Sequence, residues 1–306
     1  MLPISVQTGG LEGFYGEEEA YRLIKEGGFD AADANIDHLM SWGDVVNKRL
    51  PSWFENGHEK ELIEKAQPWK NGAKKYGIVN YQAHAPLPSF LMKDPEDPFN
   101  DVMLDVMKKC LMICDVIDCR RLIIHPAYCD YQHRLTPEKE WEINMERYSA
   151  LIPEAKKYGV TICLENMFTT NKRPYEAICS NIPMACRYVD ELNALAGEKV
   201  FGFCLDTGHL LLLGKDIKDA MIQLGDRIEA FHIHDNDGIT DQHLAPYMGV
   251  MDWERFMQGL EAIQYRKTLS FETGSIANRY PKELYPQALR LLAETGRMFG
   301  RRAMGE

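Results

Sequence analysis

The sequence of 306 residues contains no apolar run approaching the roughly 20 residues that a membrane-spanning helix needs. Its N-terminal stretch, MLPISVQTGG, lacks a charged segment followed by a long apolar run, so we expect no signal peptide. The eight cysteines form no Cys-x-x-Cys pair and often lie within apolar runs, which argues against a disulfide framework or a zinc knuckle. We therefore expect reduced core thiols, a cytoplasmic location and no contact with a membrane.

Positive charge is in deficit, because 35 lysine and arginine residues stand against 46 aspartate and glutamate residues, a formal net charge of −11. This balance disfavours a general affinity for nucleic acid, whose phosphates are bound by basic patches. The basic loop NKRPY (171–175) is interpreted as solvated surface. The glycine-rich segment GGLEGFYG lacks the Gly-x-Gly-x-x-Gly fingerprint, so no dinucleotide cofactor is expected. The expected partner is a small molecule, not nucleic acid.

What the chain does contain is an alternation of short apolar runs with longer segments whose apolar residues recur three and four positions apart. Two of the helical segments end in Tyr-Gly, at Gly77 and Gly159, and glycine is the usual residue just past a helix. Eight such alternations predict a single-domain (β/α)8 TIM barrel over residues 1–306, with a doubly wound open sheet as the alternative. The predicted strands are 4–9, 29–36, 78–85, 121–127, 160–166, 200–206, 228–234 and 268–273.

Residues of metal-ligating types stand at the ends of six consecutive predicted strands. In a closed barrel the carboxyl ends of the strands meet at one mouth, where the active sites of this fold lie. Burying many unpaired carboxylates and imidazoles together is costly, and a divalent cation removes the repulsion while using these ligand types. The sequence therefore predicts a metal site at the mouth. The residues concerned are His84, His125, Glu165, Asp206, His209, His232, His234 and Glu272, with Asp241 and His243 in the loop after the seventh strand.

The motifs HPA, LEN, CLDTGH, FHIHDNDG, DQHLAPYMG and FET carry a resemblance to the xylose isomerase-like barrels, which include sugar phosphate isomerases, D-tagatose 3-epimerase-like enzymes and endonuclease IV. The resemblance covers roughly residues 78–275. It implies one divalent ion, Mn²⁺ in the first place, with Co²⁺, Mg²⁺ or Zn²⁺ as alternatives. His232 is preferred as a ligand to His234, which we expect nearer solvent, because a histidine three residues before an acid matches the family pattern. The implied ligands are Glu165, Asp206, His232 and Glu272.

The residue types suit proton transfer beside a carbonyl group, which needs a base, an acid and a group that stabilises an enediolate. Glu165 and Glu272 lie on opposite sides of the predicted mouth and are the candidate catalytic pair, while a metal ion would neutralise the oxyanion. The resemblance thus implies a metal-dependent isomerase or epimerase of a sugar or sugar phosphate, and the sequence does not choose between the two reactions. The candidate substrate-binding residues are His84, His125, His209, His234, Asp241 and His243.

The same residues also fit phosphodiester hydrolysis, because all nine positions that match the three-zinc ligands of endonuclease IV are filled. Those positions are His84, His125, Glu165, Asp206, His209, His232, Asp241, His243 and Glu272. Against this alternative, the long loop after the second strand is aromatic and acidic, and no cluster of basic residues is evident that would hold a duplex. A lyase, a dehydratase, a glycoside-processing subunit and a non-catalytic sugar-binding barrel are further alternatives.

The longest irregular stretch, 37–57, carries two tryptophans and is either a packed surface loop or a lid over the mouth. We expect aromatic side chains to cover a bound sugar. The candidates are Trp42, Trp53, Phe14 and Trp253. A phosphate group would be bound at 273–280, where Arg279 lies. The methionine-rich segment 101–117 indicates a homo-oligomer or, more simply, a helix that packs on the barrel.

Overall fold

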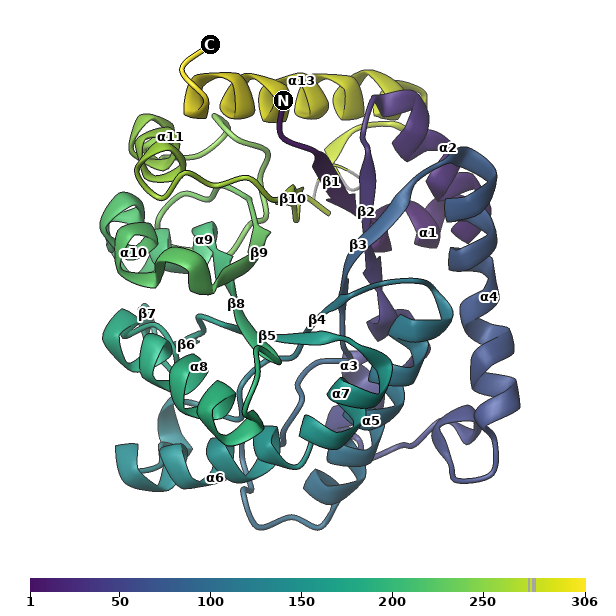
Figure 1. Cartoon of the computed structure of the whole chain (residues 1–306), viewed down its shortest axis with the longest axis vertical. Helices are drawn as coiled ribbons and strands as arrows, with labels where there is room; N and C mark the ends of the chain where they lie inside the picture. The colour runs from purple at the N-terminus through teal and green to yellow at the C-terminus, as the bar shows by residue number, and fades with distance from the viewer. Residues whose placement is uncertain (275, 277–278) are drawn as a thin grey trace.

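The computed structural model describes residues 1–274, 276 and 279–306, and within these ranges eight parallel strands form one sheet (Figure 1). The strands follow the order of the chain, and β10 pairs with β1. A parallel bridge between Ile233 and Phe271 joins β9 to β10, so the sheet is a closed barrel and the doubly wound alternative is wrong. The barrel strands are β1 (Ile4–Gln7), β2 (Ala31–Asn35), β3 (Val79–His84), β4 (Arg121–Ile123), β5 (Thr161–Glu165), β8 (Phe201–Asp206), β9 (Ile228–His232) and β10 (Leu269–Phe271).

Helices lie between consecutive strands and surround the barrel (Figure 1). The predicted glycine caps are confirmed: Gly77 follows α4 with φ 64° and Gly159 follows α7 with φ 62°, values that glycine adopts without a steric penalty. The α-helices are α1 (Gly9–Tyr15), α2 (Glu17–Gly27), α3 (Trp42–Val46), α4 (Glu59–Tyr76), α5 (Phe99–Val116), α6 (Pro137–Ser149), α7 (Ile152–Tyr158), α8 (Ile182–Ala196), α9 (Thr207–Leu212), α10 (Ile217–Leu224), α11 (Trp253–Ala262) and α13 (Tyr285–Ala303).

Short elements complete the connections between the strands and the helices. A two-stranded antiparallel hairpin follows β5 and was not expected from the sequence. It consists of β6 (Phe168–Thr170) and β7 (Pro174–Glu176). The 3-10 turns are η1 (Ile36–Leu39), η2 (Ser52–Phe54), η3 (Tyr131–His133), η4 (Gly225–Arg227) and η5 (Lys282–Leu284).

On β4, β5, β8 and β9 the inside of the barrel is apolar just below the mouth. Ile123, Cys163, Cys204 and Ala230, from β4, β5, β8 and β9, form one buried cluster. Successive side chains of a strand alternate between its faces, so the residues two positions further along lie on the same face. Those residues are His125, Glu165, Asp206 and His232, so an apolar floor lies beneath the polar strand ends.

The N-terminal end of the barrel holds a charged cluster of its own. The Oε1 atom of Glu229 on β9 lies 2.5 Å from Lys199 Nζ and 2.8 Å from Lys267 Nζ. Arg121 Nε, at the start of β4, lies 3.3 Å from the second oxygen of Glu229. Burial would raise the pKa of Glu229, but these cations outweigh it and lower the pKa. The buried carboxylate at this end is therefore neutralised by side chains of the protein.

The cysteine residues and the methionine-rich segment contribute to the core of the protein. All eight cysteines are free and seven are buried, as expected. No helix in the described ranges is long and apolar enough to cross a membrane. The segment 101–117 forms most of α5 together with its C-terminal cap, Ile117. This helix packs on α4, α7 and β4 and buries its methionine and cysteine side chains at 103, 107, 110 and 114. The simpler interpretation of this segment is confirmed, and the homo-oligomer stays a prediction.

Candidate metal centre at the barrel mouth

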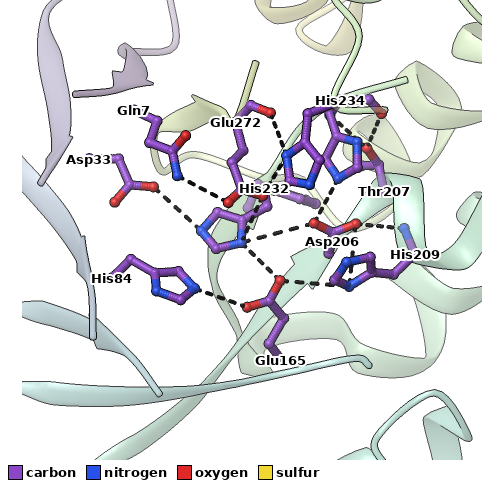
Figure 2. A network of polar contacts seen from close by, with 12 residues as sticks. Gln7, Asp33, His84, Glu165, Asp206, Thr207, His209, His232, His234 and Glu272 are labelled. Atoms are coloured by element: carbon purple, nitrogen blue, oxygen red, sulfur yellow. Dashed lines mark hydrogen bonds and ion pairs between the residues drawn. The ribbon is translucent and has the colours of Figure 1, made fainter. Parts of the chain in front are cut away.

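Four side chains from four strands converge at the C-terminal end of the barrel. Glu165, Asp206 and His232 end β5, β8 and β9, and Glu272 directly follows β10. One ligand atom of each lies within 4.8 Å of the other three. The Nδ1 atom of His232 is 2.9 Å from Glu165 Oε1, 3.6 Å from Glu272 Oε2 and 4.0 Å from Asp206 Oδ2 (Figure 2). Three carboxylates and one imidazole nitrogen are a donor set that suits Mn²⁺, Co²⁺ or Zn²⁺.

This four-residue cluster is almost completely withdrawn from solvent. Asp206 and His232 are 0% exposed, and Glu165 is 1% exposed. Among the described residues, no hydrogen bond of good geometry reaches the buried Oε2 atom of Glu165, although His125 Nε2 lies 3.2 Å away. Buried carboxylates without full hydrogen bonding are costly, and a cation would remove that cost. The residues present therefore fit a bound divalent metal ion.

The pKa values of the cluster show how its charges balance without a cation. Burial alone would raise the pKa of Glu165, but His232 and His125 outweigh it and hold the pKa well below its ordinary value. At Asp206, His209 and His234 outweigh burial in the same way and lower the pKa. Burial lowers the pKa values of His232 and His209, but neighbouring acidic groups outweigh it and raise both well above the ordinary value, so these two imidazoles carry positive charge beside the carboxylates. A divalent ion would displace those protons, because metal ligands bind in their deprotonated forms.

His234 is placed differently from His232. Its Nε2 atom lies 2.9 Å from Asp206 Oδ2, and its Nδ1 atom lies 3.9 Å from Asp241 Oδ1. The backbone of His234 is fixed by Thr207, whose hydroxyl donates to the His234 carbonyl at 2.7 Å. The ring is 0% exposed, so the expectation that it lies nearer solvent is wrong. The cause is the loop after β9, which folds back over the strand end through the bridge between Asp235 and Leu244.

His84 and His125 lie on the far side of Glu165. Their Nε2 atoms are 3.1 Å apart, and both face Glu165 Oε2, at 3.8 Å from His84 and 3.2 Å from His125. His84 donates its Nδ1–H to the Ala85 carbonyl at 2.7 Å, which leaves Nε2 directed at the mouth. Together with Glu165 they form a second group of residues with metal-ligand spacing.

His209, Asp241 and His243 lie together on the opposite side of the mouth. Asp241 Oδ2 is 3.0 Å from His243 Nε2 and 3.5 Å from His209 Nε2. Burial lowers the pKa of His243, but Glu272 and Asp241 outweigh it and raise the pKa to about 10. The rings of His234 and His243 stack at 4.2 Å. The structure thus brings all ten predicted site residues to one mouth, where the four-residue cluster lies between two flanking groups and shares Glu165 with one of them.

Two polar residues of the site were missed by the sequence analysis. Gln7 on β1 donates its amide to Glu272 Oε1 at 3.1 Å. Asp33 on β2 lies 3.4 Å from His232 Nε2 (Figure 2). The polar strand ends evident in the sequence begin at the third strand, whereas Asp33 stands inside the run AADAN of the second strand instead of at its end. An inward-facing acid within an otherwise small and apolar strand was the signal that could have found it.

A pocket of about 220 Å³ opens above these residues. Its polar wall comprises Glu165, Glu272, Asp241 and the histidines at 84, 125, 209 and 243. Its apolar wall comprises Trp42, Leu87, Pro88, Met92, Tyr128, Met167 and Phe168. A capping box between Ser41 and Asp44 starts α3 and holds Trp42 at the rim. A wall of aromatic and aliphatic side chains suits the C–H face of a small polar molecule.

The other aromatic candidates do not line this pocket, and the expectation for them is wrong. Trp53 donates its indole N–H to the Leu39 carbonyl at 3.0 Å and borders a separate surface hollow. Trp253 is buried and donates to Asp235 Oδ2 at 3.0 Å. Phe14 packs on Tyr285. Of the segment 37–57, Trp42 therefore reaches the mouth. Part of the predicted phosphate segment, 273–280, lies outside the described residues, and Arg279 is exposed.

A closed (β/α)8 barrel with carboxylates and imidazoles gathered at the carboxyl ends of its strands defines a class of barrels with a candidate metal site at the mouth. Within that class, the chain belongs to the xylose isomerase-like TIM barrel family, which it matches over residues 22–295. The family expected from the motifs is therefore confirmed.

Three known proteins illustrate the likeness. Fructoselysine 3-epimerase of Escherichia coli O157:H7 is 24% identical over 264 residues, which are 85% of this chain and 89% of that protein. The structure of 3-keto-D-glucoside 4-epimerase, YcjR, from E. coli has a TM-score of 0.70 at 18% identity, covering 97% of this chain and 100% of that one. The IOLI protein with a bound zinc atom has a TM-score of 0.65 at 16% identity, covering 99% and 98% of the two chains. At these identities the likeness establishes the fold.

Proposed function

We propose that the protein is a divalent-metal-dependent isomerase or epimerase of a sugar or sugar phosphate. The observation that carries the proposal is the convergence of Glu165, Asp206, His232 and Glu272 from four strands within 4.8 Å of one another. These four residues are the proposed ligands of one ion, with Mn²⁺ as the first candidate. The two glutamates also line the pocket, so they are positioned to meet a bound sugar.

The proposed chemistry follows from these two glutamates. A bound divalent ion would polarise the substrate carbonyl and a neighbouring hydroxyl, which makes the adjacent C–H bond more acidic. One glutamate takes the proton from that carbon, and the other returns a proton to the opposite face, which inverts the centre. Return by the same glutamate to the neighbouring carbon would instead interconvert an aldose and a ketose. His84, His125, His209, His234, Asp241 and His243 are proposed to hold the substrate oxygens.

The activities of two relatives support this proposal. Fructoselysine 3-epimerase and 3-keto-D-glucoside 4-epimerase are both epimerases of sugar derivatives, and the IOLI structure holds a zinc atom. The pocket supports a small substrate, because a space of about 220 Å³ beside Trp42 and Phe168 suits a small molecule. Free and phosphorylated sugars are both candidates.

The test is hydrogen exchange in D₂O across a panel of free and phosphorylated ketoses, with Mn²⁺ supplied. We expect deuterium at the carbon beside the carbonyl with at least one sugar. Glu165→Gln and Glu272→Gln should each abolish the exchange, because each removes one proton-transfer group. If both variants exchange at the wild-type rate, the assignment of the two glutamates is wrong.

A specific observation favours a second function, hydrolysis at abasic sites in DNA. The groups His84–His125–Glu165 and His234–Asp241–His243 each have metal-ligand spacing beside the four-residue cluster, as a multi-metal hydrolase would need. Metal counting separates the two functions. The sugar proposal expects one bound ion, with Asp241 and His243 as substrate contacts. Additional anomalous-scattering peaks beside His209 and His243, or rapid cleavage of an abasic duplex, would favour the nuclease.

A further inference from the structure

Asp33 is a fully buried carboxylate that lies on the inner face of β2, facing His232. Its Oδ2 atom is 3.4 Å from His232 Nε2, and both residues are 0% exposed (Figure 2). Gln82 on β3 donates its amide to the same Oδ2 atom at 2.8 Å and to the Phe231 carbonyl at 3.1 Å. The Asp33 carboxylate is thus held in place by Gln82, which is also hydrogen-bonded to β9, the strand of His232.

Asp33 is a charged residue at a level of the barrel where the other strands carry neutral ones, including the polar Gln82 and Ser270 two residues before His84 and Glu272. Two residues before the polar strand ends, β4, β5, β8 and β9 carry Ile123, Cys163, Cys204 and Ala230. On β2 the equivalent residue, two before Asn35, is Asp33. A carboxylate at such depth is costly without a counter-charge, so packing alone does not account for it. Asp33 is also absent from every group with metal-ligand spacing in the described part of the chain.

The two nitrogen atoms of His232 face different surroundings. Nδ1 faces the carboxylates of Glu165, Asp206 and Glu272. Nε2 is buried and makes no hydrogen bond of good geometry among the residues that the structure describes, and Asp33 Oδ2, 3.4 Å away, is the carboxylate oxygen that faces it. A neutral imidazole bears one proton, and a nitrogen that binds a metal must be the one without it. Only the ring protonated on Nε2 presents a bare Nδ1 to the three carboxylates.

We propose that Asp33 is a positioning residue that holds His232 as the Nε2-protonated form, with Nδ1 left for the metal ion. Acceptors of this kind behind a histidine ligand fix its ring and raise its basicity. The inference rests on the metal centre of the proposed function. It adds that the ligand geometry is set from the second strand, outside the region of the chain that supplies the ligands.

The experiment measures Zn²⁺ affinity by competition with a chromophoric chelator in the wild type, Asp33→Asn and Asp33→Ala. Loss of such an acceptor typically weakens metal binding about 10- to 100-fold, and we expect the alanine variant at the larger end of that range. Glu12→Gln is the matched control, because Glu12 is a buried carboxylate that contacts Trp69 and His38 but no residue of the cluster. The control should bind Zn²⁺ as the wild type does. Affinity within twofold of wild type in both Asp33 variants would overturn the proposal.

A second measurement uses the wild type alone, so it does not depend on how the variants fold. In ¹⁵N-detected spectra of the Zn²⁺-loaded protein, His232 should show a metal-bound Nδ1 and a protonated Nε2. Metal on Nε2 would contradict the proposal directly. Neither measurement needs turnover. A protein that binds Zn²⁺ in this way but exchanges no sugar hydrogen would contradict the proposed function and support the role of Asp33. A protein that exchanges sugar hydrogen but binds Zn²⁺ equally well without Asp33 would support the proposed function and contradict the role of Asp33.

Discussion

Asp206 has two tasks that depend on different properties of its side chain. Its Oδ1 atom caps α9 by accepting the His209 N–H at 2.6 Å, which needs only an acceptor. Its Oδ2 atom contributes negative charge to the four-residue cluster. Asparagine preserves the first property and removes the second, so this residue offers a clean substitution.

We predict that Asp206→Asn folds normally but loses its metal. Elemental analysis of the purified protein should fall from about one divalent ion per chain to a small fraction of that, because a carboxylate ligand has become neutral. Asp216→Asn is the matched control, since Asp216 also caps a helix, α10, by accepting the Asp219 N–H at 2.8 Å, and is not a proposed metal ligand. Full metal content and full activity in Asp206→Asn would contradict the ligand assignment.

His243 is expected to act on the substrate and not on the ion. It lines the pocket and lies outside the four-residue cluster. We predict that His243→Ala lowers kcat/KM for the sugar about tenfold, the usual effect of losing one polar contact, while the metal content is unchanged. The exposed His133, replaced by alanine in parallel, should change neither quantity. A loss of metal from the His243 variant would place this residue among the ligands.

At the scale of elements, the loop between β9 and α11 decides where Asp241 and His243 lie. Asp235 joins the two ends of this loop. Its carboxylate accepts N–H groups from Asn236 at 2.9 Å, Met251 at 3.0 Å and Gly249 at 3.1 Å, and also the indole of Trp253. At Gly249 a Cβ atom would stand 2.2 Å from the Asn236 carbonyl, so only glycine permits this closure.

We predict that Asp235→Ala frees this loop. Several buried donors lose their acceptor, which should lower the free energy of unfolding by about 2 kcal/mol and raise KM for the sugar. Amide hydrogen exchange should accelerate in residues 236–251 and stay unchanged in the barrel strands. Asp237→Ala is the control from the same loop, because Asp237 is exposed and bonds only to nearby groups such as the Thr240 N–H. Equal exchange in both variants would refute the role of Asp235.

The sequence was informative about elements whose period is regular. All eight barrel strands overlap the predicted runs, because strands buried on both faces read as short continuous apolar segments. The hairpin of β6 and β7 was missed, because FTTNKRPYE is polar and pairs only with itself. Asp33 and Gln7 were missed because their roles arise from contacts across the barrel, with His232 and Glu272, that no local pattern encodes.

At the scale of the whole molecule, Glu229 ties four strand starts together at the N-terminal end. We predict that Glu229→Gln lowers the free energy of unfolding at pH 7 by about 2 kcal/mol, less than for a fully buried pair because Lys199 is partly exposed. The folded pKa of Glu229 is lowered, so its contribution is present above the ordinary value of 4.5 and is lost as pH falls through the folded pKa.

Urea unfolding at pH 7 and at lower pH checks this prediction. The difference between the wild type and Glu229→Gln should shrink as pH falls below 4.5. Glu254→Gln serves as the control, because its partner Arg302 and Glu254 itself are both more than half exposed and such pairs contribute little. If the difference in free energy of unfolding does not depend on pH, Glu229 contributes through packing instead of through its charge.

The buried carboxylates of Glu229 and Glu165 both need positive charge nearby, but that charge comes from different sources. Around Glu229 the counterions are tethered, since lysine and arginine belong to the chain and cannot leave. Around Glu165 they are exchangeable, since protons or a dissolved ion must be drawn from the surroundings. Under the proposed metal dependence, the barrel would therefore fold before it could carry out chemistry. Newly made protein would then form a reserve of folded molecules, and the supply of metal would set how many of them are active.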